Sequence, residues 1–343
     1  MMKRKLLIAI GAILLLVSCG GSSEEPQSLT GAGATFPFPM YSKWFSEYQK
    51  AHPSVQINYQ SQGSGAGVTQ VTQGTVDFGA SDQPMTDDKI AAFTKARNTD
   101  VLHFPTVLGA VVPTYNLAGL SGEIKFTSAA LAGIFLGKIK KWNDPALAAA
   151  NPDLKLPGAE IVVVHRSDGS GTSFVWTDFL SKVSKDWDTG PGRGAAINWP
   201  VGLGGKGNEG VTGLLKQTPN SIGYTEMIYA AQNSLPMGLV QNAAGKFIKA
   251  SPASVTAAAD GVAMPDDFRV SITNAAGDEA YPISSFTWLL IPKKIDNAAK
   301  KTVIVDFLKW MLGPGQAMAP ALQYAALPAS VVTKEQAAIA LIQ

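Results

Sequence analysis

Two patterns of hydrophobic residues, one typical of strands and one typical of helices, alternate along this chain. Short apolar runs with strand character stand at residues 55–59, 76–79, 101–104, 109–115, 161–164, 221–224 and 285–291. Helical patterns cover residues 41–51, 67–73, 87–95, 128–136, 174–180, 226–232, 296–312, 315–324 and 334–342. We expect a turn between 101–104 and 109–115, and Asp296 as the cap of the long helix. Strand–helix alternation over this length predicts an α/β fold with mostly parallel sheets.

The loop between the apolar run 161–164 and the helix predicted from Phe174 has the highest concentration of residues that could bind a ligand. It reads Arg166-Ser167-Asp168-Gly169-Ser170-Gly171-Thr172-Ser173. The first amides of a helix lack intrahelical partners and lie at the positive end of its dipole, which favours an anion there. Hydroxyls and the planar charge of Arg166 suit an oxyanion. The loop lacks the Gly-Lys-[Ser/Thr] end of a nucleotide P-loop. It therefore predicts a site for a small tetrahedral oxyanion, although an ordinary strand-to-helix turn has the same pattern.

Three further loops have related composition. Small residues precede predicted helices in Thr30-Gly31-Ala32-Gly33-Ala34-Thr35-Phe36-Pro37 and in Ser61-Gln62-Gly63-Ser64-Gly65-Ala66-Gly67. A carboxylate follows a predicted strand in Asp77-Phe78-Gly79-Ala80-Ser81-Asp82. Taken singly, each is typical of a solvated turn. If the loops converge, they form a cleft at the carboxyl ends of strands, where open α/β sheets bind ligands.

The first 18 residues have the character of a signal peptide. A basic start at residues 3–5 is followed by an apolar stretch, 6–17, that is short for a bilayer span. The only cysteine, Cys19, follows small residues as in a lipobox, so we expect cleavage before it and a lipid on its sulfur. A plain signal peptide with an incidental cysteine is the alternative. Residues 19–27 are then a polar tether, expected to be disordered to about Ser28.

Composition narrows the class of protein. A chain of 343 residues with 46% hydrophobic content can bury a core, and its length favours two domains. The body has no cysteine left for a disulfide. Loss of Lys3, Arg4 and Lys5 reduces the 28 basic residues to 25, against 26 acidic ones. This balance, with no basic run carrying interleaved aromatics, argues against nucleic acid. An anion would have to be held by local dipoles rather than by a global field.

Taken together, the motifs point to a known family. The stretches at 30–37, 76–82, 168–174 and 198–208 closely resemble the substrate-binding protein of the high-affinity phosphate ABC importer, and residues 136–142 and 327–328 fit it too. The resemblance covers nearly everything after the tether. The loop around Ser64 departs from one common form of the family, with Ser61 in place of a glycine and Gly65 in place of a serine.

The resemblance implies a set of phosphate contacts, with Asp168 holding the guanidinium of Arg166 in place. The implied contacts are Thr35, Phe36, Ser64, Asp82, Arg166, Ser170, Gly171 and Thr172. Thr35, Ser64, Ser170 and Thr172 would offer hydroxyls, and Phe36 and Gly171 backbone N–H groups. The implied ligand is inorganic phosphate, with arsenate as an analogue, and no cofactor is expected. Asp82 is expected to set selectivity, because phosphate near neutral pH still carries a proton to donate and sulfate does not.

The resemblance also implies a two-domain periplasmic-binding-protein fold of type II, with the ligand cleft between the domains. The chain would cross between domains near residues 104–109 and 283–286. Domain I is then residues 28–105 and 285–343, and domain II residues 106–284. The implied partners are the permease and ATPase subunits of an ABC transporter. We expect an exported monomer, in the periplasm or cell envelope, anchored to the membrane by lipid.

Rival functions find less support in the residues. None of the three histidines, His52, His103 and His165, lies in a hydrolase motif, so an exported phosphatase-like hydrolase is a distant alternative. His52 is expected to be solvated, His103 packed, and His165 turned to the face opposite Arg166. No Cys or His spacing predicts a metal site. A binding protein for another tetrahedral oxyanion, such as sulfate or molybdate, is the closest alternative.

Overall fold

An eight-stranded mixed sheet, in the order β2-β1-β3-β11-β4-β8-β6-β7, runs through the computed structural model, which describes residues 27–343. The predicted signal peptide, Cys19 and most of the tether lie outside the described residues. Strand β1 begins at Gln27, which pairs with Val55, so the disorder predicted to Ser28 is wrong for its last two residues. Gln27 and Ser28 are ordered because β1 adds a parallel strand alongside β2.

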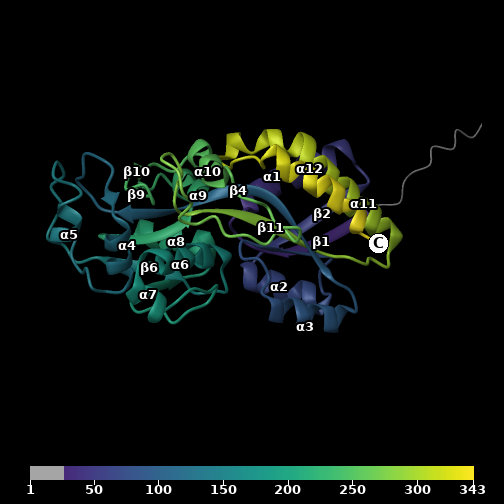
Figure 1. Cartoon of the computed structure of the whole chain (residues 1–343), viewed down its shortest axis with the longest axis horizontal. Coiled ribbons are helices and arrows are strands. Elements are labelled where there is room, and N and C mark those ends of the chain that lie inside the picture. Colours follow the sequence, from purple (N-terminus) through teal and green to yellow (C-terminus); the bar gives the residue numbers. More distant parts are fainter. Residues whose placement is uncertain (1–26) are drawn as a thin grey trace, which may run out of the picture.

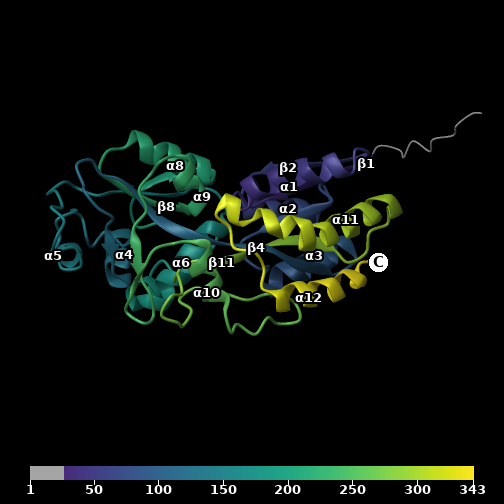
Figure 2. The same cartoon turned by 90° about the horizontal axis from the view of Figure 1, so that it is seen from above.

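The two flanks of the sheet are parallel and its centre is antiparallel. One flank holds β1 (Gln27–Gly33), β2 (Val55–Ser61) and β3 (Phe78–Ser81), and the other holds β6 (Val162–Arg166), β7 (Leu203–Gly205) and β8 (Ser221–Glu226). We call the parts of the molecule built on these flanks lobe I and lobe II (Figures 1 and 2). The long strands β4 (Val101–Asn116) and β11 (Ser284–Pro292) join them at the centre. Within this sheet, parallel pairing is confined to the flanks, because the two joining strands run antiparallel to each other and to their neighbours β3 and β8.

Strand β4 is continuous where a turn was predicted. It pairs with β11 over residues 101–110 and with β8 over 111–116, so it passes from lobe I into lobe II. The sequence at Pro105 and the following residues is typical of a turn. In the structure these residues stay extended, and the pairing of β4 with β11 shifts register between Thr287 and Trp288, as in a β-bulge. Thr106, opposite that shift, donates to the carbonyl of Thr287 and hydrogen-bonds with the hydroxyl of Tyr41.

Helices cover the faces of both flanks. Lobe I carries α1 (Phe38–Ala51), α2 (Ser64–Gln73), α3 (Asp87–Arg97), α11 (Ala298–Trp310) and α12 (Ala329–Ala338). Lobe II carries α4 (Ser128–Phe135), α5 (Pro145–Ala148), α6 (Gly171–Val183), α7 (Lys185–Thr189), α8 (Gly207–Gln217), α9 (Met227–Gln232) and α10 (Pro252–Ala259). A second small sheet in lobe II joins β5 (Lys125–Phe126), β9 (Leu239–Gln241) and β10 (Phe247–Ile248).

The C-terminal region differs most from the sequence-based elements. The helix predicted over 315–324 is a series of short turns, Met311–Gly315, Gln316–Met318 and Pro320–Leu322, because Pro314 and Pro320 lack the N–H that a continuous helix requires. Helix α12 begins five residues before the predicted start at Lys334 and is followed by a turn at Ile339–Leu341. Asn297, rather than Asp296, caps α11 by accepting from the backbone N–H of Lys300.

The order and direction of the strands bring the polar loops together where the two lobes meet. Strands β1, β2 and β3 of lobe I and β6 and β7 of lobe II end toward the region where the lobes meet, and helices begin in the loops that follow. Trp44, Trp176 and Trp288 are fully buried, which confirms that they belong to the core. Among residues 27–343, no helix has the length and apolar content needed to cross a membrane.

Candidate oxyanion site

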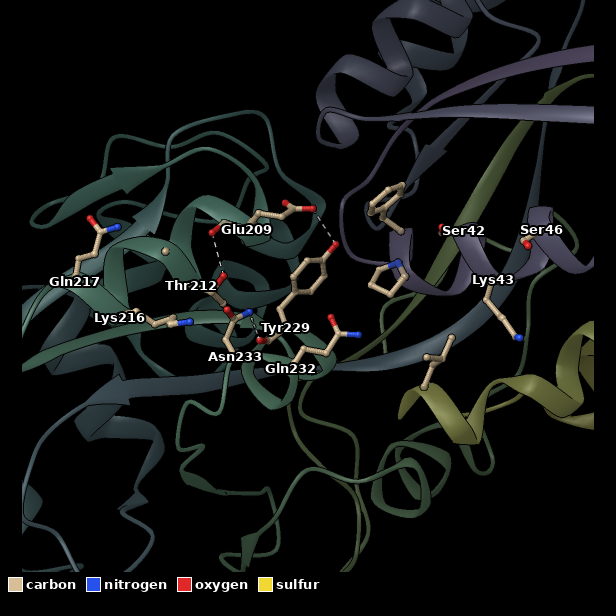
Figure 3. Close-up of a pocket in the computed structure, with 14 residues that line it drawn as sticks. Ser42, Lys43, Ser46, Glu209, Thr212, Lys216, Gln217, Tyr229, Gln232 and Asn233 are labelled. Atoms are coloured by element: carbon tan, nitrogen blue, oxygen red, sulfur yellow. Dashed lines mark hydrogen bonds between the residues drawn. The ribbon is translucent and has the colours of Figure 1, made fainter.

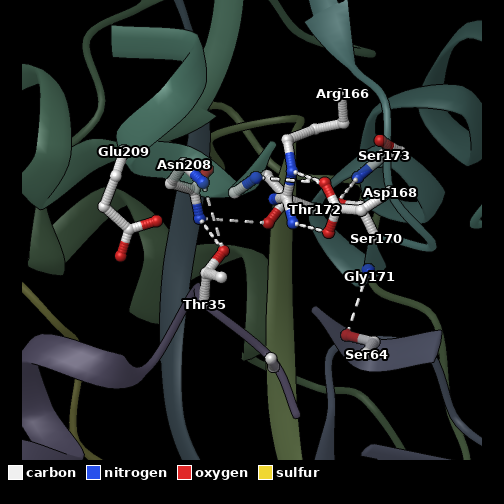
Figure 4. A network of polar contacts seen from close by, with 12 residues as sticks. Thr35, Ser64, Arg166, Asp168, Ser170, Gly171, Thr172, Ser173, Asn208 and Glu209 are labelled. Atoms are coloured by element: carbon white, nitrogen blue, oxygen red, sulfur yellow. Dashed lines mark hydrogen bonds and ion pairs between the residues drawn. The ribbon is translucent and has the colours of Figure 1, made fainter. Parts of the chain in front are cut away.

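Strand β6 ends at Arg166, whose guanidinium lies buried where the lobes meet (Figure 4). It donates from Nε to Asp168 Oδ1 at 2.8 Å and from Nη2 to Oδ2 at 2.6 Å. This two-point contact fixes the guanidinium plane. The third nitrogen, Nη1, is buried and has no hydrogen-bond partner within the part of the chain that the structure describes. A buried donor of this kind indicates a place for an acceptor.

Asp168 is held ionised beside Arg166. Burial works against its charge, but the hydrogen bonds and charge of Arg166, with the N–H of Gly207 at 3.1 Å from Oδ1, keep the pKa of Asp168 below its ordinary value. The pair is therefore neutral as a whole. As predicted, the carboxylate holds the guanidinium, so Arg166 presents a directed donor with little net charge behind it.

Helix α6 begins at the same place. The Oγ of Ser170 caps it by accepting from the N–H of Ser173 at 3.0 Å. The N–H of Gly171 donates to the Oγ of Ser64, in lobe I, at 3.0 Å. A Cβ added at Gly171 would lie 2.5 Å from that Oγ and 2.6 Å from Asp82 Oδ2. Glycine is thus required here because the two lobes approach each other at its Cα.

Lobe I contributes Thr35, Ser64 and Asp82, all at most 2% exposed. The backbone N–H of Gly65 donates to the carbonyl of Gly169 at 2.8 Å, which adds a main-chain contact between the lobes. The Oγ of Ser64 accepts from the N–H of Asp82 at 3.2 Å as well as from Gly171. The structure therefore brings these loops together with the α6 loop, as the sequence motifs predicted.

Asp82 is the buried acceptor of the cluster. Its Oδ1 accepts from the hydroxyl of Thr287 at 2.8 Å, while Oδ2 has no partner among residues 27–343. Burial raises the pKa of Asp82 to about 7, against the lowering effects of Thr287, of the charge on Arg166 and of the hydroxyls of Ser64 and Thr172. The cluster thus holds an unsatisfied acceptor oxygen in lobe I and an unsatisfied Arg166 donor in lobe II.

Phe36 lies at the site through its backbone rather than its ring. The side chain is fully buried, and the ring packs so closely on strand β4 that a Cβ on Gly109 would lie 2.6 Å from its Cζ. The Phe36 carbonyl accepts from the hydroxyl of Tyr324 at 2.6 Å. The aromatic ring therefore fixes the loop to the joining strands, and only the main chain is placed to meet a ligand.

Several residues that sequence reasoning missed complete the site. Asn208, fully buried in the first turn of α8, contacts the hydroxyls of Thr35 and Thr172. Tyr229 donates to the carbonyl of Thr35 at 2.5 Å, and the hydroxyl of Tyr224 accepts from the N–H of Arg166 at 3.1 Å. Asn208 ends the motif at 198–208, which was a signal for it. Tyr224 and Tyr229 had none, because they reach the site only through tertiary packing.

Helix N-termini converge on this cluster. Ser64 is the first residue of α2, Gly171 the first of α6 and Gly207 the first of α8. Because each helix start carries partial positive charge, three dipoles add to the single guanidinium. The cluster suits an anion without a strong positive field, as the near-neutral composition required.

Within residues 27–343, neither a metal site nor a histidine contributes to this cluster. Among the described residues, no group of three or more His, Cys, Asp or Glu side chains is placed to hold a metal. His103 is buried and accepts from the N–H of Met85, and His52 is exposed, both as expected. His165 stacks on Trp199 with ring centroids 4.8 Å apart and contacts the Arg166 carbonyl through Nδ1. None of the three belongs to the cluster.

A surface groove of about 1080 Å³ opens between α1 of lobe I and α8 and α9 of lobe II (Figure 3). None of the predicted site residues lines it. Glu209 and Tyr229 do, and the Tyr229 hydroxyl lies 3.2 Å from Glu209 Oε1 while donating to the carbonyl of Thr35. The groove is therefore separated from the site by the loop that carries Thr35.

Comparison with known proteins shows to which family the chain belongs. Residues 20–314 match the model of the PBP superfamily domain. The phosphate-binding protein PstS of Pasteurella multocida is 43% identical over 98% of this chain and 95% of its own length. PstS of Xylella fastidiosa strain Temecula1 is 44% identical over 92% of this chain and 86% of its own length. PstS of Methanocaldococcus jannaschii is 37% identical over 90% of this chain and 87% of its own length.

Solved structures agree on the fold. A high-affinity periplasmic phosphate-binding protein bound with phosphate superposes with a TM-score of 0.74 at 21% identity, over 91% of this chain and 93% of that one. A phosphate-binding protein from Stenotrophomonas maltophilia gives a TM-score of 0.71 at 18% identity, over 91% and 93%. The α/β fold of periplasmic binding proteins predicted from the sequence is thus confirmed. The chain belongs to the PBP superfamily and, within it, to the PstS family of phosphate-binding proteins.

Proposed function

We propose that this chain binds inorganic phosphate between lobes I and II. The observation that carries the proposal is the pair of unsatisfied buried atoms, Asp82 Oδ2 and Arg166 Nη1, at the convergence of three helix N-termini. A buried donor and a buried acceptor in one cluster fit a ligand that both accepts and donates hydrogen bonds. The names of the relatives support the same ligand.

The proposed contacts are those that the family resemblance implies. Around the ligand, hydroxyls, backbone N–H groups and one guanidinium donate, and Asp82 accepts. The residues are Thr35, Phe36, Ser64, Asp82, Arg166, Ser170, Gly171 and Thr172, with Asp168 positioning Arg166. Phosphate near neutral pH carries a proton that can satisfy Asp82, and sulfate has none. Arsenate, protonated in the same range, is expected to bind as an analogue.

A ligand panel tests the proposal. Titration calorimetry of the purified protein with phosphate, arsenate, sulfate and molybdate at pH 7.5 is expected to show strong heats for the first two only. Tight binding of sulfate or molybdate with no phosphate binding would favour the alternative, a binding protein for another oxyanion. Absence of turnover of a chromogenic phosphate ester by the same preparation checks that the protein is not a hydrolase.

The wider role follows from the proposed ligand. We place domain I at residues 28–105 and 285–343 and domain II at 106–284, with β4 and β11 as the hinge. The change of partner of β4 from β11 to β8 after Ala110 supports this division. Hinge closure on phosphate would exclude water and strengthen each contact. The protein is then exported, held as a monomer at the cell envelope through lipid on Cys19, and delivers phosphate to the permease and ATPase subunits of an ABC importer.

A further inference from the structure

Asn208 joins the two halves of the site. It lies in the first turn of α8, in lobe II, and is fully buried. Its Nδ2 is 2.9 Å from the Oγ1 of Thr35, in lobe I, and 3.4 Å from the Oγ1 of Thr172, in lobe II. Figure 4 shows the contacts of its side chain with the two threonines as dashed lines. One amide group thus contacts a hydroxyl from each side of the cleft.

The orientation of this amide follows from its surroundings. The Oδ1 of Asn208 accepts from the backbone N–H of Glu226 at 3.3 Å. A side-chain amide has one acceptor and two donor hydrogens, so a donor at Oδ1 leaves Nδ2 as the group that faces the threonines. Strand β8, which carries Glu226, therefore sets which end of Asn208 the hydroxyls meet.

The N–H donors of Asn208 determine in which direction the Thr35 hydroxyl can donate its proton. The Oγ1 of Thr35 accepts from Nδ2 and also from the backbone N–H of Asn208 at 3.3 Å. A hydroxyl oxygen has two lone pairs, and both are now used. Its proton must then be donated elsewhere, and no hydrogen bond among residues 27–343 takes it. Thr172 Oγ1 also accepts from Nδ2, at 3.4 Å, and this single contact constrains its hydroxyl less.

The hydroxyl oxygens of Ser64 and Ser170 also accept hydrogen bonds. The Oγ of Ser64 accepts from two backbone N–H groups, and the Oγ of Ser170 accepts from the N–H of Ser173. Each of these oxygens accepts from backbone donors, whereas Thr35 and Thr172 accept from the side-chain amide of Asn208. Removal of the Asn208 side chain would thus free one lone pair on each of the two threonine hydroxyls.

We propose that Asn208 is a positioning residue that spans the lobes and aims the hydroxyl proton of Thr35 at an oxygen of the bound anion, with a weaker hold on the hydroxyl of Thr172. The proposal rests on the proposed phosphate function. Because the amide reaches Thr35 only when the lobes are together, its removal should speed release of the anion far more than it slows capture.

A double-mutant cycle tests this role. Stopped-flow release of phosphate is measured for the wild type, Asn208→Ala, Thr35→Val and the double variant. Asn208→Ala is expected to raise the dissociation rate constant about tenfold, and its effect should fall to less than about twofold when Thr35 is already valine. A cycle with Thr172→Val should show the same coupling more weakly, since that contact is longer. Should Asn208→Ala fail to fold, Asn208→Ser takes its place.

Asn151 provides the matched control. It is also buried, and its side chain bonds only within lobe II, donating to the carbonyls of Lys125 and Leu147 and accepting from the N–H of Lys125. Asn151→Ala should lower the melting temperature and leave phosphate release unchanged. An effect of Asn208→Ala that persists in full in the Thr35→Val background, or no effect at all, would overturn the inference. Wild-type protein that binds no phosphate would instead overturn the proposed function on which it rests.

Discussion

The two halves of the site do different work with similar loops. In lobe II, strand β6 delivers the Arg166–Asp168 pair and the start of α6, a combination that suits any small oxyanion. In lobe I, the loops of Thr35, Ser64 and Asp82 bring hydroxyls and a buried carboxyl whose pKa is raised to about 7. On the proposed function, attraction and discrimination are therefore separated: lobe II supplies the directed guanidinium donor, and Asp82 in lobe I tests whether the ligand carries a proton.

The largest effect is expected where discrimination is removed. Asp82→Asn replaces an acceptor with a donor, so rejection of sulfate should relax, by up to about 10⁴-fold in relative affinity, while phosphate binding persists. Competition of sulfate against labelled phosphate measures the change. Glu335→Gln is the control, because Glu335 is another fully buried carboxyl of lobe I, away from the cluster. If sulfate competes equally poorly with wild type and Asp82→Asn, selectivity lies elsewhere.

Removing the guanidinium of Arg166 from lobe II should weaken binding of every oxyanion. Arg166→Ala is expected to cost about 2–4 kcal/mol of phosphate binding, or about 30- to 1,000-fold in affinity. Arg166→Lys should lose part of this, because it keeps the charge and loses the planar fork. Titration calorimetry measures the affinities, with Arg193→Ala as control, since Arg193 is exposed and contacts Asp178 of α6. Near wild-type affinity for Arg166→Ala would remove Arg166 from the site.

The raised pKa of Asp82 predicts a pH dependence of lobe closure. With the lobes together the pKa is about 7, and in an exposed carboxyl it is 3.8, so the closed form holds an extra proton between these values. Closure of the phosphate-free protein should therefore become easier as pH falls from 7 toward 4, by at most about tenfold per pH unit. Energy transfer between dyes on the two lobes measures it. A wild-type pH profile that Asp82→Asn leaves unaltered would contradict the assignment to Asp82.

The smallest effect is expected from a change outside both lobes. Cys19 precedes the described residues, so Cys19→Ser should leave phosphate affinity unchanged within error. It should release the protein from the membrane fraction or block its processing, because the lipid has no sulfur to join. Fractionation with immunoblotting gives the result. A Cys19→Ser protein that is cleaved correctly and stays in the membrane would count against lipidation.

Local chemistry made part of this molecule predictable. The anion loop was readable because Arg166, the small residues and the helix start are contiguous, and backbone N–H groups at a helix start favour an anion wherever the helix lies. The loops at Thr35, Ser64 and Asp82 were singled out by their composition, their individual contacts were implied by the resemblance to a family, and the structure brings the loops to the same cluster. The strand β4 was misread as two strands because Pro105 and its neighbours match a turn, and only pairing with β11 makes them extended.

The sequence by itself determined the α/β alternation, the polar loops at strand ends and the local residue types that suit an oxyanion, since these depend on neighbours within a few positions. Tertiary structure decided the rest. It raised the pKa of Asp82 through burial, and it joined Thr35 to Asn208, 173 residues apart, and Thr287 to Asp82, 205 apart. The physical reason is that the direction of a hydroxyl and the charge of a buried acid depend on which groups surround them, and the chain supplies those groups from distant positions.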